Sequence, residues 1–170
     1  MAGRKGLNEK LLVDDLKARF GDVIHETTID KGEVTHLVDG AKLFDICAFL
    51  KSDAKCQFNF LSDMHAADLH TASPRFEVVY HLYSIPKKQR VRLKVRVDDG
   101  ESVPSVTSLW QSANWAEREA YDMIGVTFAG HPNLTRIYLP SGWEGHPLRK
   151  DYPLRGYKDE YNPFGEEKKS

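Results

Sequence analysis

The stretch between Gly125 and Gly165 constrains the fold of this chain more than any other. It carries five prolines and six glycines, with aromatic and aliphatic residues scattered between them at no regular period. Because Pro and Gly interrupt helices and strands, this stretch cannot build a core of its own. Disordered segments are poor in large apolar residues, whereas this one is rich in them and therefore needs a covering surface. We expect residues 1–125 to form a folded domain and residues 126–170, the C-terminal arm, to extend from it onto a partner protein.

Composition limits the classes of function. A chain of 170 residues with 41% hydrophobic residues has enough apolar material for the core of one domain. Its 24 basic and 25 acidic residues nearly cancel, so no global field attracts nucleic acid or an anionic membrane. The first residues lack the apolar core of a signal peptide, and no uninterrupted apolar run approaches the roughly 18 residues of a membrane span. The sequence therefore predicts a soluble protein that is not exported.

Periodic patterns before the arm predict an α+β fold. Apolar residues at helical spacing predict helices over residues 7–20 and 43–50, with Asp39 and Gly40 as cap residues before the second. Runs rich in β-branched and aromatic residues predict strands at residues 23–30, 33–38, 57–64, 76–85 and 90–97. The first two strands form a hairpin, and the fourth, apolar on both faces, is a candidate for a central strand. We expect a mainly antiparallel sheet with helices packed on one face.

The strand at residues 90–97 has the most regular alternation in the chain. Its two faces are apolar (Val91, Leu93, Val95 and Val97) and basic (Arg90, Arg92, Lys94 and Arg96). The apolar face belongs to the core. Four cations on one strand could bind phosphate or nucleic acid, but a solvated face or a contact with an acidic partner is more usual.

A short charged helix is predicted over residues 115–124. Asn114 and Glu117 have the spacing of a capping box, and Gly125 stands where a helix ends. Arg118 and Asp122 are neighbours at i, i+4, so an ion pair along the helix is the simplest account of both. Carboxylates of this helix could act as acid and base in a hydrolase. At an interface the same charges would determine partner specificity.

The sequence offers few candidate ligands for a metal ion. Seven histidines are present, yet no pair has the i, i+4 spacing of HExxH. The nearest approach to a cluster is His65, Asp68 and His70, for which polar residues at a strand end are the more usual explanation. A stand-alone metal-dependent hydrolase, built on this cluster or on the helix carboxylates, is the alternative function.

Cofactor motifs are absent as well. Cys47 and Cys56, nine residues apart, fit neither a CxxC pair nor zinc or iron–sulfur spacing, so both are expected to be reduced thiols in or near the core. The chain contains no GxGxxG, GxxxxGK[ST] or GxSxG motif. We therefore expect no catalytic, cofactor-binding or metal-binding residues in this chain.

Three motifs of the helix and the arm, EREAYD, GHPNLTRI and WEGHPLRKDYPL, resemble the signature region of a known family. The family is the 30 kDa subunit, also called the C subunit, of proton-translocating NADH:quinone oxidoreductase (respiratory complex I), with equivalents in membrane-bound hydrogenases. The similarity continues upstream through FNFLSDMHAADL, RFEVVYHLYSIP and VPSVTSLWQSANW, and covers residues 58–157. The chain departs from the family at Thr135, where a basic residue is usual, and at Ile124, where an aromatic is common.

The resemblance implies a structural subunit that holds no cofactor and docks on the D subunit and other subunits of the peripheral part of the complex. Flavin, iron–sulfur clusters and quinone would belong to the partner subunits. The complex as a whole would couple electron transfer from NADH to quinone to proton translocation, on the cytoplasmic side of the bacterial inner membrane. In a hydrogenase-type relative another electron donor would replace the NADH module.

The resemblance also places one set of residues at the partner interface. These are Trp115, Glu117, Arg118, Glu119, Tyr121, Asp122, Gly125, His131, Pro132, Arg136, Trp143, Gly145, Pro147, Leu148, Arg149, Lys150, Asp151, Tyr152 and Pro153. Trp and Arg are residue types that concentrate at interface hot spots.

Overall fold

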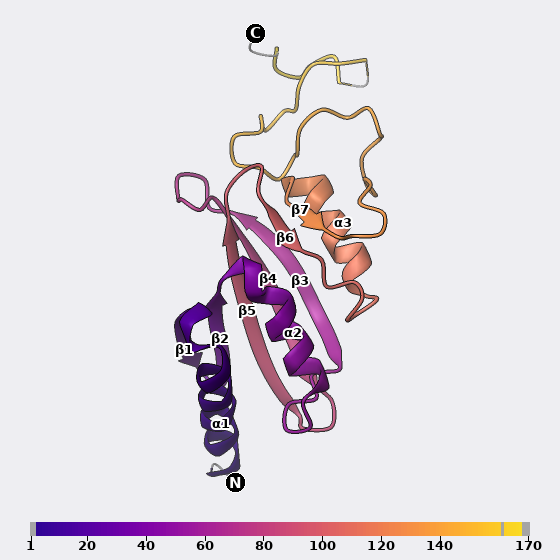
Figure 1. Cartoon of the computed structure of the whole chain (residues 1–170). Helices are drawn as coiled ribbons and strands as arrows, with labels where there is room; N and C mark the ends of the chain where they lie inside the picture. Colours follow the sequence, from indigo (N-terminus) through magenta and orange to yellow (C-terminus); the bar gives the residue numbers. More distant parts are fainter. Residues whose placement is uncertain (1–2, 161, 168–170) are drawn as a thin grey trace.

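The computed structural model describes residues 3–160 and 162–167, with side chains from residue 12 onward, and shows an α+β fold (Figure 1). The helices are α1 (Gly3–Phe20), α2 (Leu43–Ser52) and α3 (Ala113–Ile124). The strands are β1 (Ile24–Asp30), β2 (Glu33–Val38), β3 (Phe60–Asp68), β4 (Phe76–Ser84), β5 (Gln89–Val97), β6 (Ser102–Pro104) and β7 (Thr127–Ala129). The predicted fold class is confirmed.

A five-stranded sheet in the order β1-β2-β5-β4-β3 forms the body of the protein (Figure 1). Three of its four neighbouring pairs are antiparallel, and β2 pairs with β5 in parallel. The predicted hairpin of β1 and β2 is confirmed. The strand predicted to be central, β4, has a partner on each side, although β5 occupies the middle of the sheet. β3 begins three residues later than predicted and continues to Asp68.

Helices α1 and α2 lie over one face of the sheet and enclose the core (Figure 1). Leu16 of α1, Ile46 and Leu50 of α2 and Leu93 of β5 are all fully buried. The two cysteines are free thiols buried in the same core, as expected. Apolar burial of this kind contributes about 25 cal/mol per Å², and it fixes which face of each strand turns inward.

The opposite face of the sheet carries the predicted basic row, and carboxylates of neighbouring strands lie against it. Arg92 pairs with Glu33 at 3.0 Å, and Lys94 and Arg96 pair with Glu77 at 2.8 and 3.3 Å. Glu77 is buried among them. The row is thus largely neutralised within the chain, which argues against nucleic-acid binding.

The start of α3 differs from the prediction. Asn114 lies inside the helix, and Ser112 at the N-cap makes no side-chain cap hydrogen bond. Glu117 does not reach back to Asn114: it is fully buried, and its Oε1 accepts a hydrogen bond from the backbone N–H of Val106 at 2.8 Å. The capping box is therefore wrong, because the loop before the helix brings its own donor to Glu117.

The end of α3 agrees with the prediction. Gly125 has φ +87°, and its N–H donates to the carbonyls of Ala120 and Tyr121 at 3.0 Å each. A left-handed residue at this position is the usual termination of a helix, and glycine adopts it without steric cost.

Strands β6 and β7 form a separate two-stranded parallel sheet that the sequence did not reveal. Three residues are too few to display a period of two. Because β7 lies just beyond Gly125, the C-terminal arm starts within the folded body: Val126 and Phe128 are buried in the core.

Beyond β7 the arm contains no helix or strand as far as residue 160, and an isolated bridge pairs Tyr157 with Glu166. Its last described residues lie at the end of the molecule opposite the start of α1 (Figure 1). In the part of the chain that the structure describes, no helix is long and apolar enough to cross a membrane.

Candidate functional site

The C-terminal end of α3 is covered by the arm. The last carbonyls of a helix have no partner within the helix, and here the arm supplies donors. The carbonyl of Asp122 accepts hydrogen bonds from Arg136 Nη1 at 3.1 Å and from His146 Nδ1 at 3.0 Å. The carbonyl of Met123 accepts from the backbone N–H of Leu148 at 3.0 Å, and the carbonyl of Ile124 accepts from Arg149 Nε at 2.6 Å. Cations near a helix C-terminus also complement its dipole. The motif GHPLR therefore caps the helix of the motif EREAYD.

The Asp122 carboxylate lies at the centre of the junction between the end of α3 and the arm. It is fully buried, and Oδ1 accepts from Arg136 at 2.7 Å. Oδ2 accepts from three successive backbone N–H groups, those of Ile137, Tyr138 and Leu139, at 2.9, 2.8 and 3.1 Å. Burial alone would raise the pKa of Asp122, but Arg136 and the three N–H groups lower it below its usual value.

The predicted ion pair between Arg118 and Asp122 is wrong. Asp122 is already satisfied by the arm, and Arg118 turns the other way, donating to the carbonyl and hydroxyl oxygens of Thr135 at 3.0 and 2.9 Å. Its guanidinium also lies over the ring of Trp115, 5.0 Å from the centroid. Thr135, one of the departures from the family pattern, thus serves as an acceptor for Arg118.

A second set of charges fixes the arm to the end of the sheet. The Arg75 guanidinium binds both oxygens of Asp68 at 2.9 and 2.7 Å and also reaches Asp151 at 3.0 Å. Arg149 binds both oxygens of Asp99 at 2.8 and 3.0 Å. The guanidinium groups of Arg75 and Arg149 each lie 5.0 Å from the ring centroid of Phe76. Bidentate pairs of this geometry are among the stronger polar contacts in proteins.

These contacts argue against a metal site at His65, Asp68 and His70, the cluster suggested by the sequence. Asp68 accepts from Arg75 and from the backbone N–H groups of His70 and Lys150, and these donors hold the pKa of its carboxyl well below its usual range. The carboxylate that a hydrolase would need for a metal ion is therefore occupied. The alternative of a stand-alone metal-dependent hydrolase loses its main ligand.

A different trio, Asp63, His65 and His81, brings its donor atoms within 4.8 Å of one another on the open face of the sheet. It was missed because its members come from two strands whose register places Asp63 opposite His81. Asp63 and His65 are exposed. Burial lowers the pKa of His81, and the positive charge of Arg92 lowers it further. A nearby cation disfavours a second one, so the trio is poorly suited to a metal ion.

Glu117 of α3 is fully buried. Burial raises the pKa of its carboxyl to about 7, although the hydrogen bond from Val106 acts in the opposite direction. Since the folded pKa lies above the ordinary value of 4.5, the stability linked to this proton is fully present below pH 4.5. It is lost as the pH rises through about 7, and the shift corresponds to about 3 kcal/mol.

We expect Glu117→Gln to remove this dependence on pH, because the amide stays neutral and its oxygen can still accept from Val106. Between pH 5 and pH 8 the wild type should lose about 2 to 3 kcal/mol of its free energy of unfolding, and the variant should not show this loss. Urea denaturation at both pH values measures it. The exposed Glu119→Gln on the same helix is the control and should show the same loss as the wild type. An equal pH response in Glu117→Gln and wild type would refute the raised pKa.

The interface residues expected from the resemblance occupy three different environments. Glu117 and Asp122 are buried inside the chain. The exposed members are Trp115, Glu119, Pro132, Gly145, Leu148, Lys150 and Asp151. The partly exposed members are Arg118, Tyr121, Gly125, His131, Arg136, Trp143, Pro147, Arg149, Tyr152 and Pro153. Asp122 and several partly exposed members hold the arm to α3, whereas Glu117 binds the loop before the helix. The remaining members are at least partly exposed on the surface of the chain.

Exposed apolar side chains are concentrated in α3 and the arm. Among the described residues, eight large hydrophobic side chains are exposed, and five of them belong to α3 or the arm: Trp115, Tyr138, Leu148, Leu154 and Phe164. Trp115 and Tyr138 flank a groove against β3 that has Leu61 and Met64 in its wall. Scattered apolar residues are normal on a protein surface, whereas exposed apolar residues that lie together mark an interaction site, and Trp115 and Tyr138 share one groove here.

Comparison with known proteins decides the family. Residues 36–158 match the family described as respiratory-chain NADH dehydrogenase, 30 Kd subunit. The chain belongs to this family. The resemblance seen in the motifs is confirmed, and with it the expectation that the chain is part of an oxidoreductase of this kind.

Curated relatives in the 30 kDa subunit family agree. The chain is 54% identical over 149 residues to the C 2 subunit of NADH-quinone oxidoreductase from Rhizobium etli, covering 88% of this chain and 80% of the relative. It is 50% identical over 143 residues to the C subunit of NADH-quinone oxidoreductase from Geobacter sulfurreducens, covering 83% and 87%. Among solved structures, a chain of the membrane-bound sulfane sulfur reductase, an archaeal respiratory membrane complex, has the same fold, with a TM-score of 0.69, 21% identity and 85% coverage of both chains.

Proposed function

We propose that this chain is a structural component of a complex I-type NADH:quinone oxidoreductase and docks on the D subunit of that complex through α3 and the C-terminal arm. The complex as a whole transfers electrons from NADH to quinone and couples this to proton translocation. The chain lies in the peripheral part of the complex, on the cytoplasmic side of the bacterial inner membrane. The equivalent position in a hydrogenase-type complex, with a different electron donor, is the second candidate, since a chain of another respiratory membrane complex, the sulfane sulfur reductase, has the same fold.

The observation that carries the proposal is the group of exposed apolar side chains on α3 and the arm. Trp115 and Tyr138 are each 64% exposed and Leu148 is 57% exposed. Burying such side chains on a partner stabilises the complex by about 2 kcal/mol each before ordering costs are subtracted. The arm is already fixed on α3 by Asp122, Arg136 and Arg149, so little entropy is lost when residues up to Asp151 dock.

A role without a cofactor is supported by the ligands at hand. Iron–sulfur clusters need four thiolates, or thiolates with histidines, and this chain has two cysteines. Cys47 and Cys56 are both buried, and burial raises the pKa of the Cys56 thiol to about 11, which keeps it protonated. These thiols support our proposal that the iron–sulfur clusters, together with flavin and quinone, are held by the partner subunits.

The test is to place a charge on the proposed surface. We expect Trp115→Glu and Leu148→Asp each to reduce the amount of the D subunit that co-purifies with the tagged chain by at least about tenfold, since a buried hot spot contributes 2 kcal/mol or more. Neither side chain is needed for the core, so thermal melting of the purified chain should change by no more than a few degrees.

Two exposed apolar residues elsewhere provide matched controls. Ile29→Asp on β1 and Ile85→Asp after β4 replace side chains that are 54% and 57% exposed, far from the arm in sequence. They should leave recovery of the D subunit unchanged. Equal losses in all four variants would show that the effect is general, and normal recovery with Trp115→Glu and Leu148→Asp would exclude this surface from docking.

A further inference from the structure

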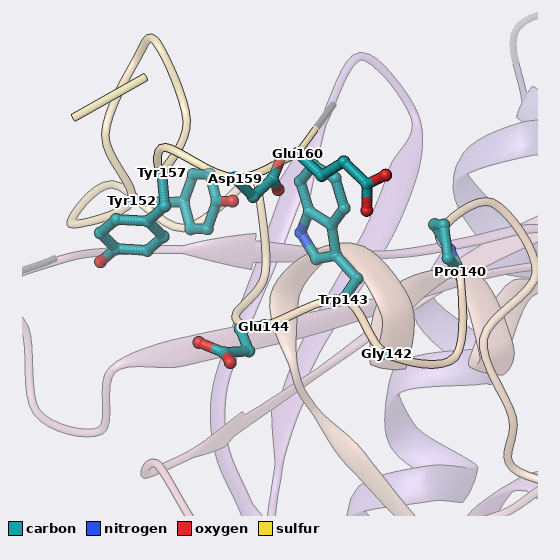
Figure 2. A pocket seen from close by; sticks show the side chains of 8 residues that line it. All are labelled: Pro140, Gly142, Trp143, Glu144, Tyr152, Tyr157, Asp159 and Glu160. Carbon is teal, nitrogen blue, oxygen red and sulfur yellow. The ribbon is translucent and has the colours of Figure 1, made fainter. Parts of the chain in front are cut away.

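The arm forms an open pocket of about 320 Å³ (Figure 2). Among the described residues, its lining combines three aromatic rings and three carboxylates with no basic residue. The lining residues are Pro140, Gly142, Trp143, Glu144, Tyr152, Tyr157, Asp159 and Glu160. Figure 2 shows the indole of Trp143 rising between the turn at Pro140 and the segment that carries Asp159 and Glu160.

Hydrogen bonds and a contact between two aromatic rings hold the walls of this pocket in place. The N–H of Trp143 donates to the carbonyl of Pro140 at 3.0 Å, and Arg136 Nη2 donates to the carbonyls of Trp143 and Gly145 at 3.0 Å each. The rings of Tyr152 and Tyr157 meet edge to face, with centroids 5.2 Å apart. Since Arg136 is itself fixed by Asp122, the pocket and the end of α3 form one connected structure.

The approach of Gly145 to Tyr152 shows how closely this wall is packed. Gly145 has φ +81°, and a Cβ at this position would lie 2.9 Å from Cε2 of Tyr152. A real Cβ does not tolerate that distance to a ring. The turn at Gly145 therefore allows the tyrosine ring to come close enough to line the pocket.

The chemistry of this lining selects a particular occupant. The faces of Trp and Tyr rings attract a cation through their quadrupole, Trp most strongly. Carboxylates at the rim add an attraction for the same charge. A guanidinium is planar, stacks on aromatic faces and pairs with carboxylates through several N–H donors, whereas an ammonium offers only a compact, strongly hydrated charge.

We propose that this pocket receives an arginine side chain of the partner protein on which the chain docks. The inference rests on the proposed function and adds the identity of one contact. A protein supplies this arginine, because the exposed Leu148, Leu154 and Phe164 on the same arm need an apolar partner surface. The arginine is an anchor of the kind that interface hot spots use.

The first test uses small probes on the purified full-length chain. Nα-acetyl-arginine amide is titrated while the three tryptophan indole N–H signals are followed by NMR, after assignment with single Trp→Phe variants. We expect a saturable shift confined to the Trp143 signal. Nα-acetyl-lysine amide should bind with lower affinity, and the neutral isostere Nα-acetyl-citrulline amide should cause no shift. Glu160→Gln should weaken arginine amide binding roughly fivefold, as expected for one exposed charge contact. The matched control Asp14→Asn on α1 should not.

The second test uses the docked complex. Glu160→Arg should reduce co-purification of the D subunit by at least about tenfold through charge repulsion in the pocket, and Asp14→Arg should leave it unchanged. The proposal is overturned if arginine amide produces no saturable shift at Trp143, if citrulline amide binds as well, or if Glu160→Arg docks normally. Each of these outcomes leaves the docking surface itself intact as long as Trp115→Glu still prevents docking, so the two proposals fail separately.

Discussion

Asp122→Asn is expected to lower the free energy of unfolding by about 3–5 kcal/mol, the cost of leaving one member of a buried ion pair without its partner. The substitution keeps the size of the side chain but removes its charge. Arg136 would remain, only 15% exposed at its side chain, beside a neutral amide. The amide NH₂ would also face either Arg136 or the three backbone N–H groups that now donate to the carboxylate. The junction between α3 and the arm should therefore open.

Urea denaturation of the purified chain at pH 7 measures this loss. Asp45→Asn is the control, because Asp45 forms an ion pair with Lys42 in which both side chains are more than half exposed. An exposed pair of this kind contributes less than about 1 kcal/mol. If Asp122→Asn were as mild as Asp45→Asn, the carboxylate would not hold the arm.

Gly125→Ala is expected to be the most disruptive glycine substitution in the arm junction. A Cβ at residue 125 would lie 2.4 Å from Nη2 of Arg149 and 2.6 Å from Cδ2 of His146, and both side chains are engaged with the end of α3. The residue also has φ +87°, which costs a non-glycine residue about 1–2 kcal/mol. Strain and displacement of the two side chains together should cost about 3 kcal/mol and release residues 146–149.

Gly130→Ala provides the matched control. Gly130 has nearly the same conformation, φ +80°, but nothing lies within 4 Å of its added Cβ. It should therefore show the backbone cost alone, about 1–2 kcal/mol. Thermal melting and limited proteolysis of the arm distinguish the two variants, since only Gly125→Ala should expose residues 140–151 to protease. Equal behaviour of both variants would mean that Arg149 and His146 yield without cost.

The sequence predicted those parts of the fold that repeat along the chain. Regular alternation located β5, and its four aliphatic residues are buried as expected. Helical spacing located α1 and α2, and Gly125 marked the end of α3. Contacts between residues distant in sequence were not predictable: the spacing of Arg118 and Asp122 suggested an ion pair, but their partners come from residues 135–139.

The candidate site shows the same division. The aromatic and arginine content of the arm indicated a surface that needs a cover, and the structure shows that α3 provides part of it. Asp122 could not be assigned to the interior from its charge alone, because its burial depends on three N–H groups and an arginine that follow 14 to 17 residues later. Glu117 was misread for the same reason, since its donor Val106 lies before the helix.

The central claim, that α3 and the arm face the D subunit, is tested most directly by the solvent accessibility of individual side chains. Hydroxyl-radical footprinting of the free chain and of its binary complex with the D subunit measures oxidation at Trp115, Tyr138 and Leu148, with Ile29 and Ile85 as internal references. We predict that oxidation at the first three falls strongly in the complex while the references stay unchanged. Unchanged oxidation at Trp115, Tyr138 and Leu148 in a complex that has formed would show that the D subunit binds another surface.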